Sequence, residues 1–572
     1  MNDLRLGQCL GTVPAPSFRR TYNESQINSL SHQNNITFTL QKSTFREARD
    51  EIRSRTLQSP PASGSGFGAG AGSSRIAHQA GVNCLAIDPV SGRYLFSGGA
   101  DSTIRVWDLE KRENPTFKSQ AAGNGGTNTN ESQYLQYYRP TASLTRGSAA
   151  AAHTHALTSI SIYPFDPTPT TLLSTSYDKT LKVTSITPTS LVPVHTFDLD
   201  FLPYTHCMST VVDASPLIAV GTAHPAVRLL DLRTGLSTHS LSGPNGAVYT
   251  VSWSPKKSFL LASGSADGRV LFYDIRRANA VFASLDLDDA VGVVGEFPST
   301  GAGARPELLD FHAVAHNGPV TSVQWTPSGD RLVTTGHDQR IRVWDTSTGR
   351  NELVHFGPRI RNERHGELKP LISPLGTHRP GHESLFWPND DGRGVIFQHH
   401  LREGHLLQSL RTQGIKLAEI QAAAAQSRGG GRARGRGGAG GGGGGGGAGG
   451  GGGSSSLGRL TSGGRINAMV WRSNAPAGDA VEMYTAHGDG SICAWMPRHA
   501  GAGAGAGTAD QDEEADPEAD VGQIEPPSLA STPLPQPAPA DAEEDADRRR
   551  KRKRELMADL VEGLARRPMR FS

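Results

Sequence analysis

The sequence has little cysteine and no long apolar run. Its 572 residues include four cysteines, which lie far apart and form no CxxC pair. This spacing argues against a disulfide framework and a cysteine-based zinc site, and it favours a reducing compartment. No stretch approaches the ~18 consecutive apolar residues of a membrane helix, and the first residues lack a signal-peptide core. We therefore expect a soluble intracellular protein with no membrane partner.

Aromatic residues and net charge are also low. Aromatics make up 6% of the chain, the formal net charge is +2, and glycine is abundant at 68 residues. A charge balance so close to neutral excludes a strongly basic nucleic-acid coat and a polyanionic protein. We expect direct nucleic-acid binding to be weak or absent. The glycine excess indicates that only part of the chain builds a packed core.

Two segments have compositions that cannot bury apolar surface. Residues 428–453 are arginine and glycine followed by almost pure glycine, and we interpret them as a linker in preference to an RNA contact. Residues 499–547 are rich in glycine and alanine, then in acids and proline. They hold thirteen acidic residues and no lysine or arginine from Asp510 to Asp547. We expect the linker and the C-terminal tail to be disordered.

Between these segments the sequence repeats one pattern. Examples are SGGADSTIRVWDLE at 97–110 and VTTGHDQRIRVWDTS at 333–347. In each unit a turn containing Asp precedes an alternating strand that ends in Trp-Asp or a substitute. The Trp positions of the second to fourth units lie 46 and 43 residues apart, close to the ~40–45 residues of a WD repeat. Four short strands per unit, repeated around a ring, predict an all-β, seven-bladed WD-repeat β-propeller.

The repeats divide the chain into three parts. Residues 1–33 form an N-terminal segment in which PSFRRTYNESQINSL is a candidate docking helix, 34–498 form the propeller, and 499–572 form the tail. Insertions are expected at about 50–74, 112–150, 286–311 and 421–463.

Two parts of the propeller have weaker signals. Residues 371–410 are predicted to be the sixth blade, with degenerate strands. NITFTLQ at 35–41 alternates well and is predicted to complete the last blade, because a ring of blades must close. The capped segment 44–57 is interpreted as an inserted helix.

One unit carries a histidine, a hydroxyl and an aspartate that resemble a hydrolase triad. These residues, together with the tryptophan of the same unit, are His316, Thr334, Asp338 and Trp344. Similar sets recur around the ring, so we interpret them as a structural hydrogen-bond relay. The chain has no G-x-S-x-G elbow, Walker loop or H-E-x-x-H motif. We expect no enzyme activity, no cofactor and no metal, and we interpret His399 and His400 as surface residues.

Two units place an arginine two residues after the aspartate that ends the strand. The pairs are Asp231 with Arg233 and Asp274 with Arg276. Alternate strand residues share a face, so each pair should project together from the bottom of the ring. Such an arginine could bind a partner's carboxylate, or it could only pair with its own aspartate, which adds little stability at a surface.

A run of seven basic residues follows the acidic tail. It consists of Arg548, Arg549, Arg550, Lys551, Arg552, Lys553 and Arg554. A cationic run in a tail favours a nuclear import signal, and a non-specific nucleic-acid contact is the alternative. We therefore expect a nuclear protein.

These repeats resemble the Cockayne syndrome A family. The resemblance rests on VNCLAIDPVSGRYLFSGGADSTIRVWDLE, on AVGTAHPAVRLLDLRTG with His224 in place of the turn aspartate, and on the HCMS segment at His206–Ser209. It covers roughly residues 76–360 well and the last blade adequately. The N-terminal 33 residues, the glycine linker and the tail lie outside it.

The resemblance implies a non-catalytic substrate receptor of a cullin-4 ubiquitin ligase that acts in transcription-coupled nucleotide excision repair. It implies docking on damage-specific DNA-binding protein 1 through the bottom face and an N-terminal helix. The Asp-x-Arg pairs belong to that receptor signature. The opposite face would recruit a Cockayne syndrome B-like translocase and the RNA polymerase II machinery. The alternative is a WD-repeat scaffold in chromatin or RNA processing without ligase attachment.

Overall fold

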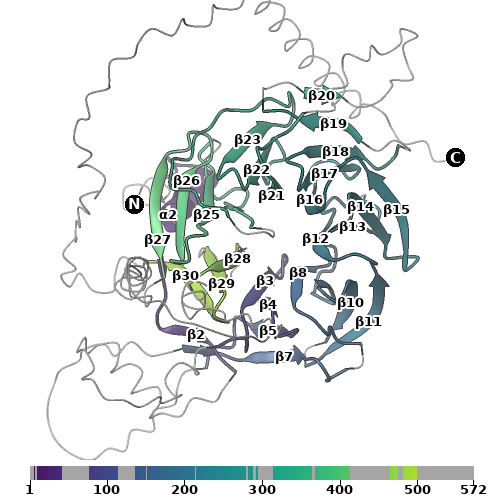
Figure 1. The fold of residues 1–572 in the computed structure, drawn as a ribbon. Coiled ribbons are helices and arrows are strands. Elements are labelled where there is room, and N and C mark those ends of the chain that lie inside the picture. Colours follow the sequence, from purple (N-terminus) through teal and green to yellow (C-terminus); the bar gives the residue numbers. More distant parts are fainter. Residues whose placement is uncertain are drawn as a thin grey trace, which may run out of the picture.

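Seven small antiparallel sheets stand around a ring in the computed structural model (Figure 1). The structure describes residues 6, 9–40, 76–113, 136–149, 151–187, 189–212, 214–277, 281–287, 291–293, 313–363, 368–379, 381–412, 464–473 and 481–498. The predicted seven-bladed β-propeller is confirmed.

Each blade is a meander whose first strand lies nearest the ring centre and whose last strand lies at its rim (Figure 1). Blade 1 contains β3 (Val82–Ile87), β4 (Tyr94–Gly99), β5 (Ile104–Asp108) and β7 (Pro140–Leu144). Blade 2 contains β8 (Leu157–Ile162), β9 (Thr171–Ser176), β10 (Thr180–Ile186) and β11 (Leu191–Asp198). Blade 3 contains β12 (Pro203–Met208), β13 (Leu217–Thr222), β14 (Ala226–Asp231) and β15 (Leu236–Ser242).

Blades 4 and 5 depart from four strands in the described residues. Blade 4 has five, namely β16 (Val248–Trp253), β17 (Leu260–Ser265), β18 (Val270–Asp274), β19 (Val281–Leu285) and β20 (Val291–Val293). Blade 5 has β21 (Val320–Trp325), β22 (Arg331–Gly336) and β23 (Ile341–Asp345). Blade 6, at the predicted position, has β24 (Leu371–Ile372), β25 (Ser384–Pro388), β26 (Val395–His400) and β27 (Leu406–Arg411).

The N-terminus closes the ring, but through a different strand from the one predicted. Blade 7 consists of β28 (Ile466–Arg472), β29 (Glu482–His487), β30 (Ile492–Pro497) and, at its outer edge, β1 (Leu30–His32). β1 pairs antiparallel with β30, with Leu30 opposite Pro497. The first strand and the last strand of the described residues thus share one sheet, which removes an open seam.

The predicted closing segment 35–41 has another position. Its strand β2 (Ile36–Phe38) pairs in parallel with β6 (Gln136–Tyr138) in a separate two-stranded sheet. Phe38 is buried against Trp107 of blade 1 and Tyr484 of blade 7, with ring centroids 5.2 and 6.0 Å away. Both faces of β2 are buried. Its apolar side chains, Ile36 and Phe38, pack between blades 1 and 7. The prediction that it completes the last blade is therefore wrong.

Part of the segment expected to be an insertion at 112–150 is structured. It supplies β6 and also β7, the outer strand of blade 1. The sequence from 136 to 144 lacks the Trp-Asp signal, because an outer strand carries none of the blade's marker residues. The segments 44–57, 428–453 and 499–572 lie outside the described residues.

One helix, α2 (Ala15–Asn28), forms where the docking helix was predicted. It begins directly after Pro14, and Pro16 stands in its first turn, where the missing backbone N–H of proline has no intrahelical partner to lose. Only Ile27 is fully buried, residues 21–26 are partly buried, and the first turns, 15–20, are mostly exposed. It lies beside blade 6 (Figure 1), where the Gln398 amide donates to Asn28 Oδ1 at 2.8 Å.

Apolar side chains fill the spaces between neighbouring blades. The space between blades 1 and 7, for example, holds Trp107, Tyr138 and Tyr484, all fully buried. Each blade face is covered only by the next blade, so closure of the ring completes the core.

Candidate partner-binding surfaces

The His–Thr–Asp–Trp set of blade 5 forms a continuous hydrogen-bond relay. Trp344 Nε1 donates to Thr334 Oγ1 at 2.9 Å, and Thr334 Oγ1 lies 2.8 Å from His316 Nε2. His316 Nδ1 lies 2.9 Å from Asp338 Oδ1. Thr334 is fully buried, and both of its hydrogen-bonding directions are used, so it is not placed to attack a substrate.

The surroundings of the relay determine the protonation states of His316 and Asp338. Burial lowers the pKa of His316, outweighing the opposite effect of the Asp338 carboxylate. Burial alone would raise the pKa of Asp338, but hydrogen bonding to His316 and the nearby Arg342 guanidinium hold it below its usual range. A neutral imidazole thus lies between the Thr334 hydroxyl and the Asp338 carboxylate, and Arg342 pairs with the same carboxylate.

Blade 1 contains an equally complete relay. His78 bonds to Ser97 Oγ at 2.7 Å and to Asp101 at 3.0 Å, and Trp107 donates to Ser97 at 2.9 Å. The sequence signal for it was present, since Ser97, Asp101 and Trp107 stand at the same spacing as Thr334, Asp338 and Trp344 of blade 5, and the histidine lies one residue further upstream. Repetition in two blades supports a structural role.

The two Asp-x-Arg pairs occupy equivalent turns between the third and fourth strands of blades 3 and 4. Arg276 forms two hydrogen bonds with Asp274, both 2.9 Å long. Arg233 contacts Asp231 at 3.3 and 3.2 Å. In both pairs the aspartate also accepts the arginine's backbone N–H. Each arginine is therefore paired with its own aspartate and held in one orientation at the bottom rim.

The two arginines differ in their surroundings. The Arg233 side chain is 68% exposed, whereas Arg276 is 25% exposed because it lies over the Phe259 ring, 3.5 Å from its centroid. The hydrogen bond from Arg233 lowers the pKa of Asp231 and keeps it ionised. Both guanidinium groups are pre-ordered, which reduces the entropy lost when a partner carboxylate binds.

Blade 6 contains a third arginine of this kind that the sequence analysis did not single out. Arg402 stands two residues after His400, and the turn has the same hydrogen bond as in blade 3, with Gly404 N–H donating to His400 O at 2.8 Å. HLREG at 400–404 matches DLRTG at 231–235, so the signal was visible. Arg402 lies 3.6 Å from Glu383 instead of an aspartate of its own turn.

The interpretation of His399 and His400 as surface residues is wrong. They are 4% and 6% exposed, because they take the positions of the Trp-Asp pair at the end of the third strand. His399 contacts the Phe356 ring, with centroids 5.5 Å apart.

The bottom rim and α2 share one edge of the ring. In an antiparallel meander the loop after the first strand and the turn after the third lie at the same end. Glu24 of α2 lies 3.7 Å from Arg379, which is in the loop after the first strand of blade 6. The helix is therefore placed on the same side as the Asp-x-Arg turns.

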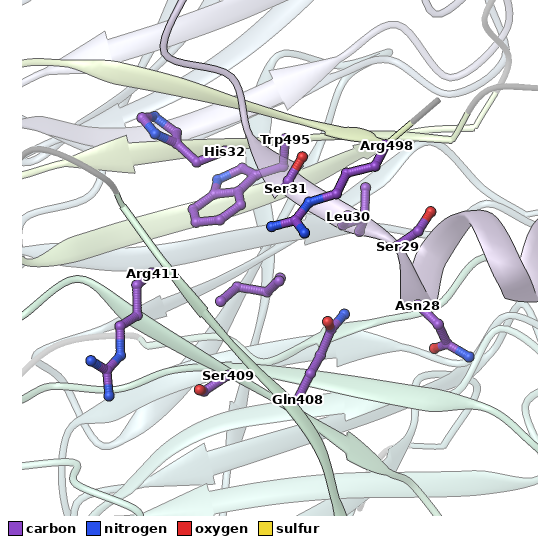
Figure 2. Close-up of a pocket in the computed structure, with 11 residues that line it drawn as sticks. Asn28, Ser29, Leu30, Ser31, His32, Gln408, Ser409, Arg411, Trp495 and Arg498 are labelled. Carbon is purple, nitrogen blue, oxygen red and sulfur yellow. The ribbon is translucent and has the colours of Figure 1, made fainter. Parts of the chain in front are cut away.

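A groove of about 420 Å³ separates the outer strands of blades 6 and 7. Leu410 and Trp495 contribute apolar surface to its lining, and Arg411 and Arg498 extend from opposite sides (Figure 2). Among the described residues no acidic side chain lines it, so the two arginines give the groove positive charge.

Other features concern the remaining predictions. No disulfide joins the four cysteines. Among the described residues, no helix is both long and apolar enough to cross a membrane. The basic run 548–554 lies outside the described residues.

Comparison with known proteins agrees with this architecture. The model of the WD domain, G-beta repeat, matches residues 73–108, 147–185, 235–274 and 310–345. The chain is 30% identical over 331 residues to the WD repeat-containing protein ATCSA-1 of Arabidopsis thaliana, covering 49% of this chain and 69% of the plant protein. The chain belongs to the WD-repeat family.

Other relatives of this WD-repeat protein carry a different name. The ribosome biogenesis protein ytm1 of Aspergillus clavatus is 28% identical over 274 residues, and YTM1 of Phaeosphaeria nodorum is 28% identical over 282 residues. These matches cover 46% and 47% of this chain, and the chain spans about half the length of those proteins, 52% and 55%. A WD-repeat propeller is a scaffold for protein–protein interaction.

Proposed function

We propose that this WD-repeat protein is a non-catalytic substrate receptor of a cullin-4 ubiquitin ligase in transcription-coupled nucleotide excision repair. Its adaptor would be damage-specific DNA-binding protein 1. The match to ATCSA-1 and the resemblance to the Cockayne syndrome A family support this proposal. The opposite face would hold a Cockayne syndrome B-like translocase or the RNA polymerase II machinery.

One structural observation carries the proposal. Arg233 and Arg276 stand at equivalent turns on one face, each oriented by its own aspartate. The helix α2, whose first turns are mostly exposed, lies at the same edge. Two rigidly held guanidinium groups next to a helix suit an adaptor that offers carboxylates to the arginines and a groove to the helix. The receptor would act by raising the effective concentration of its cargo at the ligase.

Binding of purified adaptor to the full chain tests the proposal. We expect Arg233→Glu and Arg276→Glu each to weaken binding at least about tenfold, because each replaces an attractive pair by repulsion at the rim. Arg393→Glu is a matched control. It also follows an aspartate by two residues, Asp391, but it stands in the turn between β25 and β26, at the opposite end of the blade.

The outcomes separate two functions. If the wild-type chain does not bind the adaptor, the ligase proposal fails. The alternative, a scaffold in RNA processing or chromatin without a ligase, then has the stronger support through the ytm1 matches. If the wild type binds and both rim variants bind equally well, the adaptor contact lies elsewhere.

A further inference from the structure

The turn between β26 and β27 gathers three side chains that can ligate a metal ion. The ligand atoms of His400, Glu403 and His405 lie within 4.8 Å of one another. His400 is buried, whereas the side chains of Glu403 and His405 are 67% and 51% exposed. We propose that these three residues bind one divalent transition-metal ion of the zinc class, with water completing its coordination. Sequence analysis predicted no metal, because H-x-x-E-x-H matches none of the familiar spacings.

Two of the ligand atoms already have the required separation. Glu403 Oε2 and His405 Nδ1 are 3.1 Å apart, and two ligands of a tetrahedral zinc ion at about 2.0–2.1 Å lie about 3.3 Å apart. His400 Nδ1 accepts the Glu403 backbone N–H at 3.2 Å, so a lone pair faces the turn. A metal ion on this nitrogen would replace that long hydrogen bond. The His400 and His405 rings are stacked, with centroids 5.1 Å apart, so the exposed His405 and Glu403 side chains must rotate to bring all three ligand atoms onto one ion.

The backbone of the turn is held in place without a metal. Gly404 N–H donates to His400 O at 2.8 Å, and His400 N–H donates to His405 O at 3.0 Å. His399 Nδ1 lies 3.0 Å from Gly404 O. Gly404 has φ +76°, and a Cβ there would lie 2.3 Å from the His355 carbonyl oxygen. Little backbone ordering entropy therefore opposes metal binding.

The surrounding charges permit a cation. Arg402, the nearest guanidinium in the turn, lies 3.6 Å from Glu383, which offsets its charge. The His382 ring packs edge-on against His400, with centroids 5.5 Å apart. Two imidazoles and one carboxylate favour zinc, nickel or copper over magnesium or calcium. Blade 3 has Asp231 at the position of His400 and no histidine at that of His405, so it lacks this set.

Calorimetric titration of zinc chloride into untagged, chelator-treated full-length protein tests the site. We expect one saturable site, and we expect His405→Ala and Glu403→Gln each to weaken it at least tenfold. The matched control is His239→Ala, an exposed histidine on the outer strand of blade 3. Both ligand side chains are largely exposed, so the variants should keep the wild-type circular dichroism spectrum.

A second measurement uses cobalt as the probe. Bound Co²⁺ gives visible d–d absorption, which we expect in the wild type and the His239→Ala variant and not in the His405→Ala, Glu403→Gln double variant. The proposal is overturned if wild-type protein shows no saturable zinc binding. It is equally overturned if the double variant binds zinc and cobalt like the wild type, because the metal then sits at other ligands.

Discussion

At the residue scale, the buried polar groups of this propeller stabilise the fold only when every group keeps its hydrogen-bond partners. In blade 5, Thr334 connects the Trp344 indole to the His316 imidazole. The loss of one member leaves the others buried without a partner, which costs more than the hydrogen bond itself contributed.

Thr334→Val tests this cooperativity, because valine matches the shape of threonine and removes only the hydroxyl. We expect a loss of about 1–3 kcal/mol in the free energy of unfolding, measured by urea denaturation. Thr238→Val is the control. Its hydroxyl donates to Leu229 O from an exposed outer strand, where water can replace it, so we expect a change within about 0.5 kcal/mol. Equal effects of the two substitutions would contradict the relay.

Buried histidines predict that the protein is sensitive to acid. Burial lowers the pKa of His206 to about 3 and that of His378 to about 4, and nearby cationic groups such as Lys369 contribute for His206. Histidine in the unfolded chain titrates near 6.5. Below that pH the unfolded state binds more protons than the folded state, so the free energy of unfolding falls as the pH is lowered from about 6.5 towards 4.

Urea unfolding at pH 7.5 and 5.0 measures this dependence. His206 by itself accounts for at most about 2 kcal/mol over this interval. His206→Gln removes the titrating group and should give a shallower pH dependence, although the bond to Ser161 Oγ at 2.7 Å is altered too. If the unfolding free energies of variant and wild type change in parallel with pH, His206 does not contribute to the acid sensitivity.

At the element scale, three residues of β1 close a ring of seven blades. Leu30 is 3% exposed and packs in the cluster that contains Trp471 and Trp495. The strand also joins α2 to the propeller, since the helix ends two residues before it.

Leu30→Asp should therefore open blade 7. We expect a loss of at least about 2 kcal/mol in unfolding free energy, because a carboxylate would be buried without a partner. Hydrogen exchange should become faster in β28, β29 and β30 before the other blades. Leu10→Asp, at a position that is 69% exposed in the same N-terminal segment, is the control and should match the wild type. Uniformly faster exchange in all blades would show that the ring does not open at this seam.

At the scale of the whole molecule, we expect the propeller and the C-terminal tail to have separate roles. The tail carries thirteen acidic residues between Asp510 and Asp547, followed by seven basic residues. Cationic runs of this kind are read by import receptors.

Deletion of 548–554 from a fluorescent fusion is expected to shift the protein from the nucleus to the cytoplasm. Deletion of the seven residues 530–536, which contain no charged side chain, controls for tail length. Nuclear retention after the first deletion would refute the import signal.

The sequence by itself determined the blade count, the relay residues and the Asp-x-Arg turns. These features depend on local periodicity and fixed spacing, which repeat in every unit. It also offered PSFRRTYNESQINSL as a candidate docking helix, and the helix found there runs from Ala15 to Asn28.

Only the tertiary structure decided which N-terminal strand closes the ring, which segment forms the outer strand of blade 1, and that His399 and His400 are buried. Each of these features depends on how segments that are far apart in the sequence pack against the edge of a blade. Two short N-terminal strands, Leu-Ser-His at 30–32 and Ile-Thr-Phe at 36–38, lie close together in the sequence. Their places are decided by packing, of Leu30 with Trp495 and of Phe38 with Trp107 and Tyr138. The grouping of His400, Glu403 and His405 likewise exists only once the third and fourth strands of blade 6 pair and fold the turn back on itself.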